Sequence, residues 1–214
     1  MGARDTILDA VRRNRPAGEH PLPDLPHFPL LGLSRETVAE RSAFFVTALK
    51  SMGGRFFDGP VKQLIAAQFG EINVIASVVP EVAGNHDLAA TTDPRELADV
   101  DVAVVRAAFA IAETGTVALP DALLGVNAVA YLAQHIIVLV DPADIVLTVQ
   151  DAYRRPDMAA HAYLAFHTGP SATADIEGVL IHGAQGVRSL TVVFAAKPAS
   201  RRGAAQTVPP EPIP

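Results

Sequence analysis

The sequence predicts an α/β fold in which helices flank a mostly parallel β-sheet. Strand-like and helix-like segments alternate along the chain, which is the pattern of consecutive βαβ units. The runs Asp101–Arg106 and His135–Val140 are almost continuously apolar, as expected for strands that are covered on both faces. Half of the 214 residues are hydrophobic and 19% are charged, so the chain can bury a large core. This composition excludes a mainly disordered protein.

The N-terminal residues 1–33 are predicted to lie outside this domain. Residues 5–13 have the periodicity of a short helix. Residues 16–33 contain five prolines, which lack an N–H group and disfavour a preceding helix, so an extended arm is expected. The arm carries large apolar side chains that either the chain's own domain or a partner should cover, among them Leu22, Leu25, Phe28, Leu30 and Leu31.

The domain itself is predicted to span residues 34–196. Ser34 is expected to cap a first helix, whose apolar residues recur at helical spacing until Gly53 and Gly54 end it. Strands are predicted at residues 55–57, 72–77, 101–106, 116–119, 135–140, 164–167 and 190–195. Further helices are predicted at residues 61–69, 145–153 and 174–182. Residues 197–214 contain five prolines and almost no large apolar residue, so a disordered tail is expected there.

Charge and missing motifs argue against several classes of function. The net charge is −6 and no run of Lys or Arg occurs, so no nucleic-acid partner is expected. The sequence lacks the G-x-G-x-x-G, G-x-x-x-x-G-K-[ST], H-E-x-x-H and G-x-S-x-G motifs. The seven histidines are scattered without the spacing of metal ligands, so no metal site is predicted. The sequence also lacks a long apolar span and the apolar core of a signal peptide, which predicts a cytoplasmic protein.

The chain contains no cysteine. This excludes a disulfide, a thiol nucleophile and a cysteine-ligated zinc site. It also excludes an iron–sulfur cluster held by the chain's own thiolates. No cofactor is therefore expected on this chain.

Three segments carry candidate site residues, and the first runs from Glu113 to Thr116. Glu113, Thr114, Gly115 and Thr116 lie between two apolar runs. A partly buried glutamate beside a glycine can serve as a base, an acid or a nucleophile at the edge of a crevice. The alternative is that Glu113 caps a turn or binds backbone N–H groups, with the two threonines closing the turn.

The second segment follows the predicted strand 164–167 and opens the predicted helix 174–182. Gly169, Ser171 and Thr173 lie in this turn, where free N–H groups and the helix dipole favour an anion. The alternative is that Ser171 or Thr173 is simply the N-cap and Asp175 complements the dipole. If the turn and Glu113 border one parallel sheet, both should face the crevice outside the carboxyl ends of its strands.

The third segment, His182 to Gly186, joins that predicted helix to the last strand. His182 and Gln185 could project into the cleft and bind a ligand. The alternative is a histidine at the C-terminal end of the helix, where the helix dipole favours it, with Gly183 as the C-cap.

Four segments resemble one known family. AIAETGTV (110–117), HIIVLV (135–140), GPSATADIE (169–177) and HGAQGVRSL (182–190), in this order, are similar to the LUD-domain family, and within it to the lactate utilization protein C, or YkgG, family. The resemblance implies an open Rossmann-like sheet similar to the sugar-isomerase and coenzyme A-transferase (NagB/RpiA-like) superfamily. It also implies a role in oxidising L-lactate to pyruvate, together with partner proteins that carry iron–sulfur clusters. The chain would then be the non-redox component of that system.

Two departures from the family pattern bear on ligand binding. Relatives commonly have Arg at the position of Ala172, and HG-x-HGP where this chain has HGAQGVR. A guanidinium and an imidazole that could bind a small carboxylate or phosphorylated ligand are therefore missing. Two alternative functions are a ligand-sensing regulator of the pathway and a stand-alone isomerase or coenzyme A-transferase-like enzyme that uses Glu113. The second rests on Glu113-Thr114-Gly115, which is similar to the E-x-G context of those transferases. The chain could also form a homo-oligomer.

Overall fold

The structure is a computed structural model that describes residues 2–16, 18, 37–70, 74–173, 181–182 and 186–198. The chain divides into two compact units, residues 1–31 and residues 32–214. In the first unit, helix α1 (Ala3–Arg13) confirms the expected short helix and exposes Ile7 and Val11. Most of the predicted proline-rich arm lies outside the described residues, as do residues 199–214 of the predicted tail. No helix of the described part of the chain is long and apolar enough to cross a membrane.

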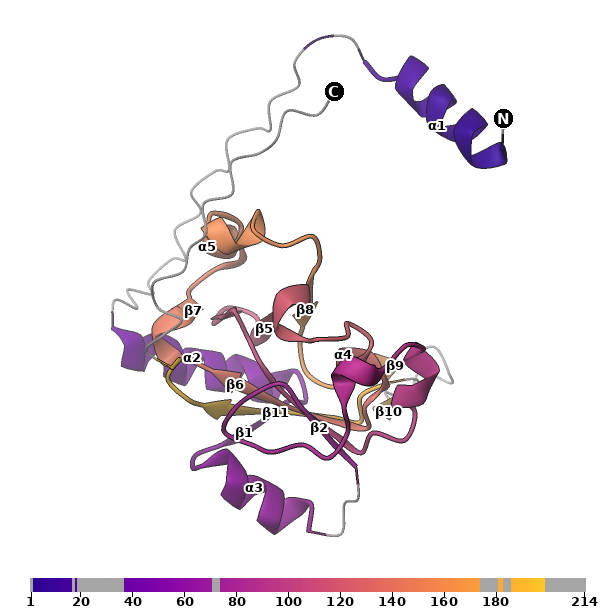
Figure 1. Ribbon diagram of the computed structural model, residues 1–214. Coiled ribbons are helices and arrows are strands. Elements are labelled where there is room, and N and C mark those ends of the chain that lie inside the picture. Colours follow the sequence, from indigo (N-terminus) through magenta and orange to yellow (C-terminus); the bar gives the residue numbers. More distant parts are fainter. Residues whose placement is uncertain are drawn as a thin grey trace. The chain divides into compact units, whose positions relative to one another are not determined.

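The second unit is built on a parallel sheet, as predicted (Figure 1). Its strands lie in the order β1 (Arg55–Phe57), β11 (Ser189–Phe194), β6 (His135–Val140), β3 (Val102–Arg106) and β2 (Ile75–Ser77). All neighbouring pairs are parallel. Strand β6 pairs with both β3 and β11, and these two ladders are the longest in the sheet. The two continuously apolar runs of the sequence are thus the two adjacent central strands β3 and β6.

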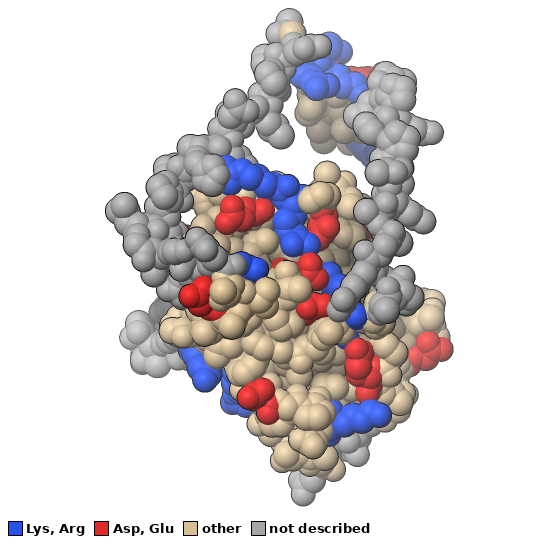
Figure 2. All heavy atoms as spheres, turned by 90° about the vertical axis from the view of Figure 1, so that its left-hand side faces the viewer, with Lys and Arg blue, Asp and Glu red and all other residues tan. Residues whose placement is uncertain are grey.

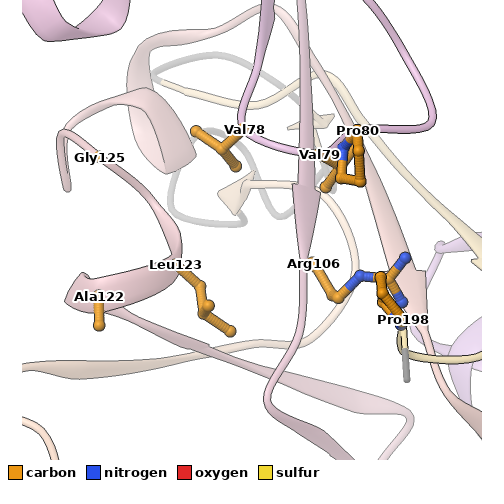
Figure 3. A pocket seen from close by; sticks show the side chains of 8 residues that line it. All are labelled: Val78, Val79, Pro80, Arg106, Ala122, Leu123, Gly125 and Pro198. Carbon is orange, nitrogen blue, oxygen red and sulfur yellow. The ribbon is translucent and has the colours of Figure 1, made fainter. Parts of the chain in front are cut away.

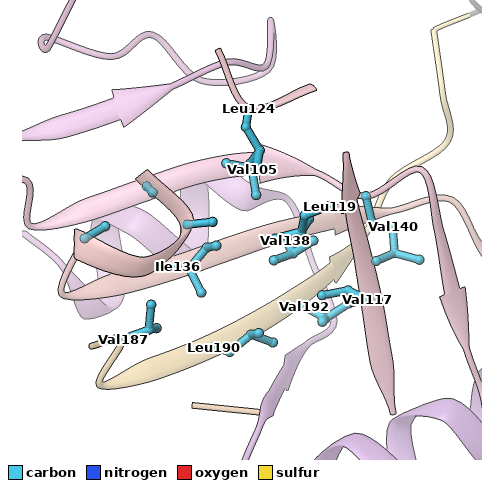
Figure 4. Close-up of a cluster of buried hydrophobic side chains, with 14 of the residues drawn as sticks. Val105, Val117, Leu119, Leu124, Ile136, Val138, Val140, Val187, Leu190 and Val192 are labelled. Carbon is cyan, nitrogen blue, oxygen red and sulfur yellow. The ribbon is translucent and has the colours of Figure 1, made fainter. Parts of the chain in front are cut away.

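Each face of this sheet is covered by a different layer. Helix α3 (Val61–Gln68) buries Val61 and Leu64 against one face, which presents Val104 and Ile137. Helix α2 (Val38–Ser51) buries Phe45 and Leu49 in the core on the other face. The side chains of that second core, among them Val105, Ile136, Val138 and Val192, are shown in Figure 4. Burial on both faces explains why the central strands carry no polar alternation.

A second sheet completes the α2 side and was not expected. Its strands lie in the order β7 (Ile145–Val146), β4 (Phe109–Ile111), β5 (Thr116–Pro120) and β8 (Leu164–His167). Strands β4 and β5 are antiparallel, as are β5 and β8. The predicted strands 116–119 and 164–167 therefore exist but do not belong to the parallel sheet. The turn of residues 112–115 between β4 and β5 is too short for the crossover that a parallel pair needs.

Several element boundaries differ from the prediction. Thr37, not Ser34, caps α2, because its side chain accepts a hydrogen bond from the Glu40 N–H group in a capping box. Only the second half of the predicted helix 145–153 is helical, as α5 (Val149–Tyr153), since Ile145 and Val146 form β7. The structure adds α4 (Val129–Leu132) and short 3₁₀ turns, which are Leu88–Ala90, Pro94–Leu97, Asp121–Leu123, Pro142–Asp144 and Pro156–Met158.

The predicted helix 174–182 is wrong at its C-terminal end. Strand β9 (Ala172–Thr173) pairs antiparallel with β10 (Ile181–His182), so His182 lies in a strand. Residues 174–180 lie outside the described residues.

The segment that follows β11 closes the carboxyl ends of the central strands. Arg106, the last residue of β3, donates from Nη1 to the Ala195 carbonyl at 2.9 Å and pairs with Glu81 through Nη2. The Lys197 backbone N–H donates to Asp141 at 2.8 Å, and its ammonium donates to the Ala108 carbonyl at 2.8 Å. The contacts of the domain therefore reach Lys197, one residue beyond its predicted end.

Charged groups are mixed on the surface of this unit. On the face drawn in Figure 2, basic and acidic side chains alternate without a broad patch of one sign. This distribution agrees with the net charge of −6 and does not resemble a nucleic-acid-binding surface.

Candidate functional site

Two adjoining hollows lie where the C-terminal end of α2 meets the loops that follow β4 and β8. The first, here called the threonine cleft, has a volume of about 510 Å³ and is lined by Met52, Glu113, Thr114, Thr116, Phe166 and Thr168, among others. The second, here called the His167 hollow, has a volume of about 260 Å³ and is lined by Tyr131, Phe166, His167, Thr168, Ser171 and Gly186, among others. Phe166 and Thr168 line both, so the two hollows meet along the end of β8.

A chain of threonine hydroxyls joins the two predicted loop segments. Thr114 Oγ1 lies 2.6 Å from Thr116 Oγ1, and Thr116 Oγ1 lies 2.5 Å from Thr168 Oγ1. Each hydroxyl has one proton and can accept further hydrogen bonds, so the two ends of this chain can donate to or accept from a ligand. The 113–116 turn therefore contacts Thr168, the residue directly before the 169–173 loop, whereas the expected reach of Glu113 to residues 169–173 stays a prediction.

Glu113 lines the threonine cleft and is also bound to backbone. Its carboxylate Oε2 accepts a hydrogen bond from the Val149 N–H group at 3.0 Å, in the first turn of α5. Its own N–H group donates to the Leu147 carbonyl at 2.9 Å. One carboxylate oxygen therefore binds a backbone N–H group, as the alternative interpretation of Glu113 expected. A catalytic role for the carboxylate stays a prediction.

Gly115 and Gly169 hold the two loops against α2. Gly115 has φ +67°, and a Cβ there would lie 2.2 Å from the Leu49 nitrogen. Gly169 has φ +73°, and a Cβ there would lie 2.2 Å from the Met52 carbonyl oxygen. Both positions therefore need glycine for the close approach of two backbones. This packing explains why both residues are glycines, and their predicted role in ligand binding stays a prediction.

The remaining predicted site residues are dispersed. Ser171 lines the His167 hollow, and its N–H group donates to the Val187 carbonyl at 2.9 Å. Thr173 lies in β9 and lines neither hollow. The side chain of His182 and the whole of Gln185 lie outside the described residues. Ala172 and Thr173 are extended and paired with β10, and residues 174–180 lie outside the described residues, so the anion site expected at a helix N-terminus after Gly169 stays a prediction.

Both hollows lie at the amino ends of the central parallel strands, not outside the carboxyl ends as predicted. Gly169 packs against Met52 and Gly54, immediately before β1 begins. Ser171 binds Val187, two residues before β11 begins. The expectation assumed that Glu113 and the loop border the parallel sheet, whereas their strands belong to the second sheet.

A third hollow, of about 370 Å³, lies at the carboxyl end of β3 (Figure 3). Figure 3 shows the Arg106 side chain reaching toward Pro198, with Val78, Val79 and Leu123 around it. The guanidinium is already bound to Glu81 and to the Ala195 carbonyl. The positive charge of Arg106 is therefore already paired within the fold. This hollow is a weaker candidate for a ligand-binding site than the other two.

Sequence reasoning missed His167 and Tyr131. The His167 Nε2 atom is buried without a hydrogen-bond partner among the described residues, and burial lowers the pKa of this imidazole. The Tyr131 ring centroid lies 4.9 Å from that of His167. Burial and the hydrogen bond to the Tyr163 hydroxyl raise the pKa of Tyr131 to about 12. A histidine next to the Thr168-Gly169 turn could have been noted from the sequence, whereas nothing in it points to Tyr131.

A family comparison covers this whole region. The LUD domain model matches residues 36–195, about three quarters of the chain and all residues that line the two hollows. The chain belongs to the LUD-domain family. The sequence-based resemblance is thereby confirmed at the level of the LUD domain.

A solved LUD-type structure has the same fold. This chain is similar to a DUF162 family protein from Deinococcus radiodurans, with 20% sequence identity and a TM-score of 0.53. The match covers 74% of this chain and 98% of the other. At this identity the likeness concerns the fold alone. A comparison with curated proteins gives no match.

Two half-buried histidines of this LUD domain predict that its stability falls in mild acid. An unfolded histidine takes up a proton near pH 6.5, but burial lowers the pKa of His167 and of His135 in the folded chain. As the pH falls below about 6.5, the unfolded state therefore binds more protons, and the free energy of unfolding decreases. Urea unfolding between about pH 7.5 and pH 5 should show this decrease.

The variant His167→Gln isolates one contribution to that decrease. It cannot take up a proton in this range, so its free energy of unfolding should fall less steeply with decreasing pH than that of the wild type. Above about pH 7.5 the difference between the two proteins should stay constant, because both histidines are then neutral in either state. An identical slope for variant and wild type would contradict a buried, neutral His167.

Proposed function

We propose that the chain is a non-redox component of an L-lactate utilization system that oxidises L-lactate to pyruvate together with iron–sulfur partner proteins. The observation that carries the proposal is the LUD-domain match over residues 36–195, because this domain is associated with lactate utilization proteins. The ETGT and GPSATADIE segments lie within the matched region and support the closer resemblance to the lactate utilization protein C family.

The residue types of the chain support a role without electron transfer. Oxidation of L-lactate to pyruvate releases two electrons and two protons, and an acceptor must take the electrons. An iron–sulfur cluster needs thiolate ligands, and the sequence has no cysteine, so this chain does not fit such a cluster. In the proposed system the clusters therefore reside on partners, and this chain contributes binding and positioning through its polar groups.

Gene deletion and co-purification test the proposal. A strain of the source organism that lacks the gene should lose L-lactate-dependent dye reduction in lysates and grow normally on pyruvate. A tagged wild-type copy should restore the reduction and co-purify with protein-bound iron. Unchanged L-lactate-dependent reduction in the deletion lysate would overturn the proposal, and so would a tagged protein that restores nothing.

A matched pair of variants links that activity to the threonine cleft. Thr116→Val removes the central hydroxyl of the Thr114–Thr116–Thr168 chain and should lower the L-lactate-dependent reduction severalfold. Thr47→Val removes an exposed hydroxyl of α2 that binds only the Ala43 carbonyl among its described contacts, and should have no effect. Equal activities in both variants would place the contribution of this chain outside the cleft.

A stand-alone isomerase or coenzyme A-transferase-like enzyme is the second candidate, because Glu113 lines a cleft. The variant Glu113→Gln separates the two candidates. Its amide oxygen can still accept the Val149 N–H group, so the fold is kept while the carboxylate is lost. The leading proposal expects L-lactate-dependent activity to persist in this variant. A transferase that uses Glu113 as its nucleophile would lose all activity.

A further inference from the structure

The threonine cleft and the His167 hollow form one groove with an unusual balance of polar groups. They meet at Phe166 and Thr168, and six hydroxyl-bearing side chains line them, namely Ser51, Thr114, Thr116, Thr168, Ser171 and Tyr131. Hydroxyls carry no charge at neutral pH, including that of Tyr131, whose pKa is raised to about 12. The groove is therefore rich in hydrogen-bonding groups that can both donate and accept.

The charge of the groove comes from one carboxylate. Glu113 is the only Asp or Glu among the described residues that line it, and none of these lining residues is Lys or Arg. No cation within this set can therefore offset the charge of Glu113 or of an anionic ligand.

The N–H groups at the start of α5 are already occupied, and the imidazole that lines the groove is neutral. The Val149 N–H group in the first turn of α5 donates to Glu113, and the Asp151 N–H group donates to Thr148. The His167 imidazole remains uncharged near neutral pH because burial disfavours its protonated form. A carboxylate in this groove would thus lose water, face Glu113 and meet only neutral groups.

An uncharged polar ligand meets the opposite conditions. His167 lines the groove, and its Nε2 atom is enclosed without a hydrogen-bond partner among the described residues, so a ligand hydroxyl or amide would satisfy this atom once the ring turns toward the groove. The ends of the threonine chain offer a donor and acceptors beside it. We infer that this groove binds a small uncharged ligand that carries hydroxyl or amide groups, with His167 as a central polar contact, and that it discriminates against carboxylates such as L-lactate.

The inference is independent of the lactate assignment, because it concerns binding to the purified chain. L-lactate and L-lactamide differ only in that a carboxylate is replaced by an uncharged amide, so the two probes isolate the effect of charge. Binding to the full chain at pH 7 can be followed by NMR through the His167 ring and the Thr168 amide. We expect saturable shifts with L-lactamide at roughly millimolar affinity, and at least about ten-fold weaker binding of L-lactate.

Two variants test the named groups. His167→Leu should weaken L-lactamide binding about ten-fold, whereas His161→Leu, which replaces a histidine beside Asp121 and outside the groove, should not. If His167→Leu does not fold, His167→Gln provides the same comparison with a polar side chain of similar reach. Glu113→Gln removes the negative charge and should bring L-lactate binding closer to that of L-lactamide.

The outcomes of this experiment are distinct from those of the lactate test. Binding of L-lactate that equals or exceeds that of L-lactamide would overturn the inference while leaving the proposed function standing. Absence of binding by either probe would overturn it as well. Loss of L-lactate oxidation in the deletion strain, by contrast, bears only on the proposed function.

Discussion

Gly115→Ala is expected to lower the free energy of unfolding by roughly 3 kcal/mol or more. An alanine at φ +67° is strained by about 1 kcal/mol, and its Cβ would lie 2.2 Å from the nitrogen and 2.5 Å from the Cα of Leu49. These are backbone atoms of α2, which cannot shift easily because Phe45 and Leu49 are fully buried in the core. Urea unfolding followed by circular dichroism measures the loss.

Gly125→Ala is the matched control for this prediction. Gly125 has nearly the same backbone angle, φ +70°, but a Cβ there would meet its nearest atom, Val78 Cγ1, at 3.6 Å. Only the backbone strain of about 1 kcal/mol is then expected. Equal losses in the two variants would show that the approach of the 113–116 turn to α2 does not limit stability.

Arg106→Met is expected to cost roughly 2–3 kcal/mol of unfolding free energy. The guanidinium is nearly completely buried, pairs with Glu81 and donates to the Ala195 carbonyl at 2.9 Å. Methionine fills part of the volume but leaves that carbonyl without a donor and Glu81 without its cation. Glu81 is 30% exposed, so water can compensate in part, which keeps the loss below that of a fully buried pair.

The control is an exposed pair of the same chemistry. Arg95 pairs with Asp93 but its side chain is 90% exposed, so Arg95→Met should leave the stability unchanged within the error of the measurement. Thermal and urea unfolding of the two variants, measured under the same conditions, compare their losses of stability. A loss for Arg106→Met as small as that for Arg95→Met would mean that the carboxyl ends of the central strands do not depend on this contact.

The central sheet could be predicted because its strands carry a strong signal. Strands β3 and β6 are buried on both faces, and so they appear in the sequence as uninterrupted apolar runs. The second sheet gave no comparable signal. Strand β4 follows β3 after only Ala107 and Ala108, and no glycine or proline marks the boundary. A short strand in a continuous apolar stretch cannot be told from an extension of its neighbour.

The candidate site was predictable in its loops but not in its surroundings. Glu113, Thr116 and Ser171 follow from local turn chemistry, and all three line the groove. Tyr131 reaches it from α4, whose four residues carry too little periodicity to be recognised. The pairing of Ala172 and Thr173 with Ile181 and His182 was missed because strands of two residues carry too short a pattern to be recognised in the sequence.

The strand order also constrains when this protein can fold during synthesis. Among the described strands β1 pairs only with β11, so that Arg55 lies opposite Thr191 and Phe57 opposite Val193. Strand β11 in turn occupies the place between β1 and β6. Until residues 189–194 have left the ribosome, β1 has no partner, and the edge of β6 stays open to other strands. A stalled or truncated chain that ends before β11 should therefore be a target for chaperones and proteases, although most of its core residues are already made.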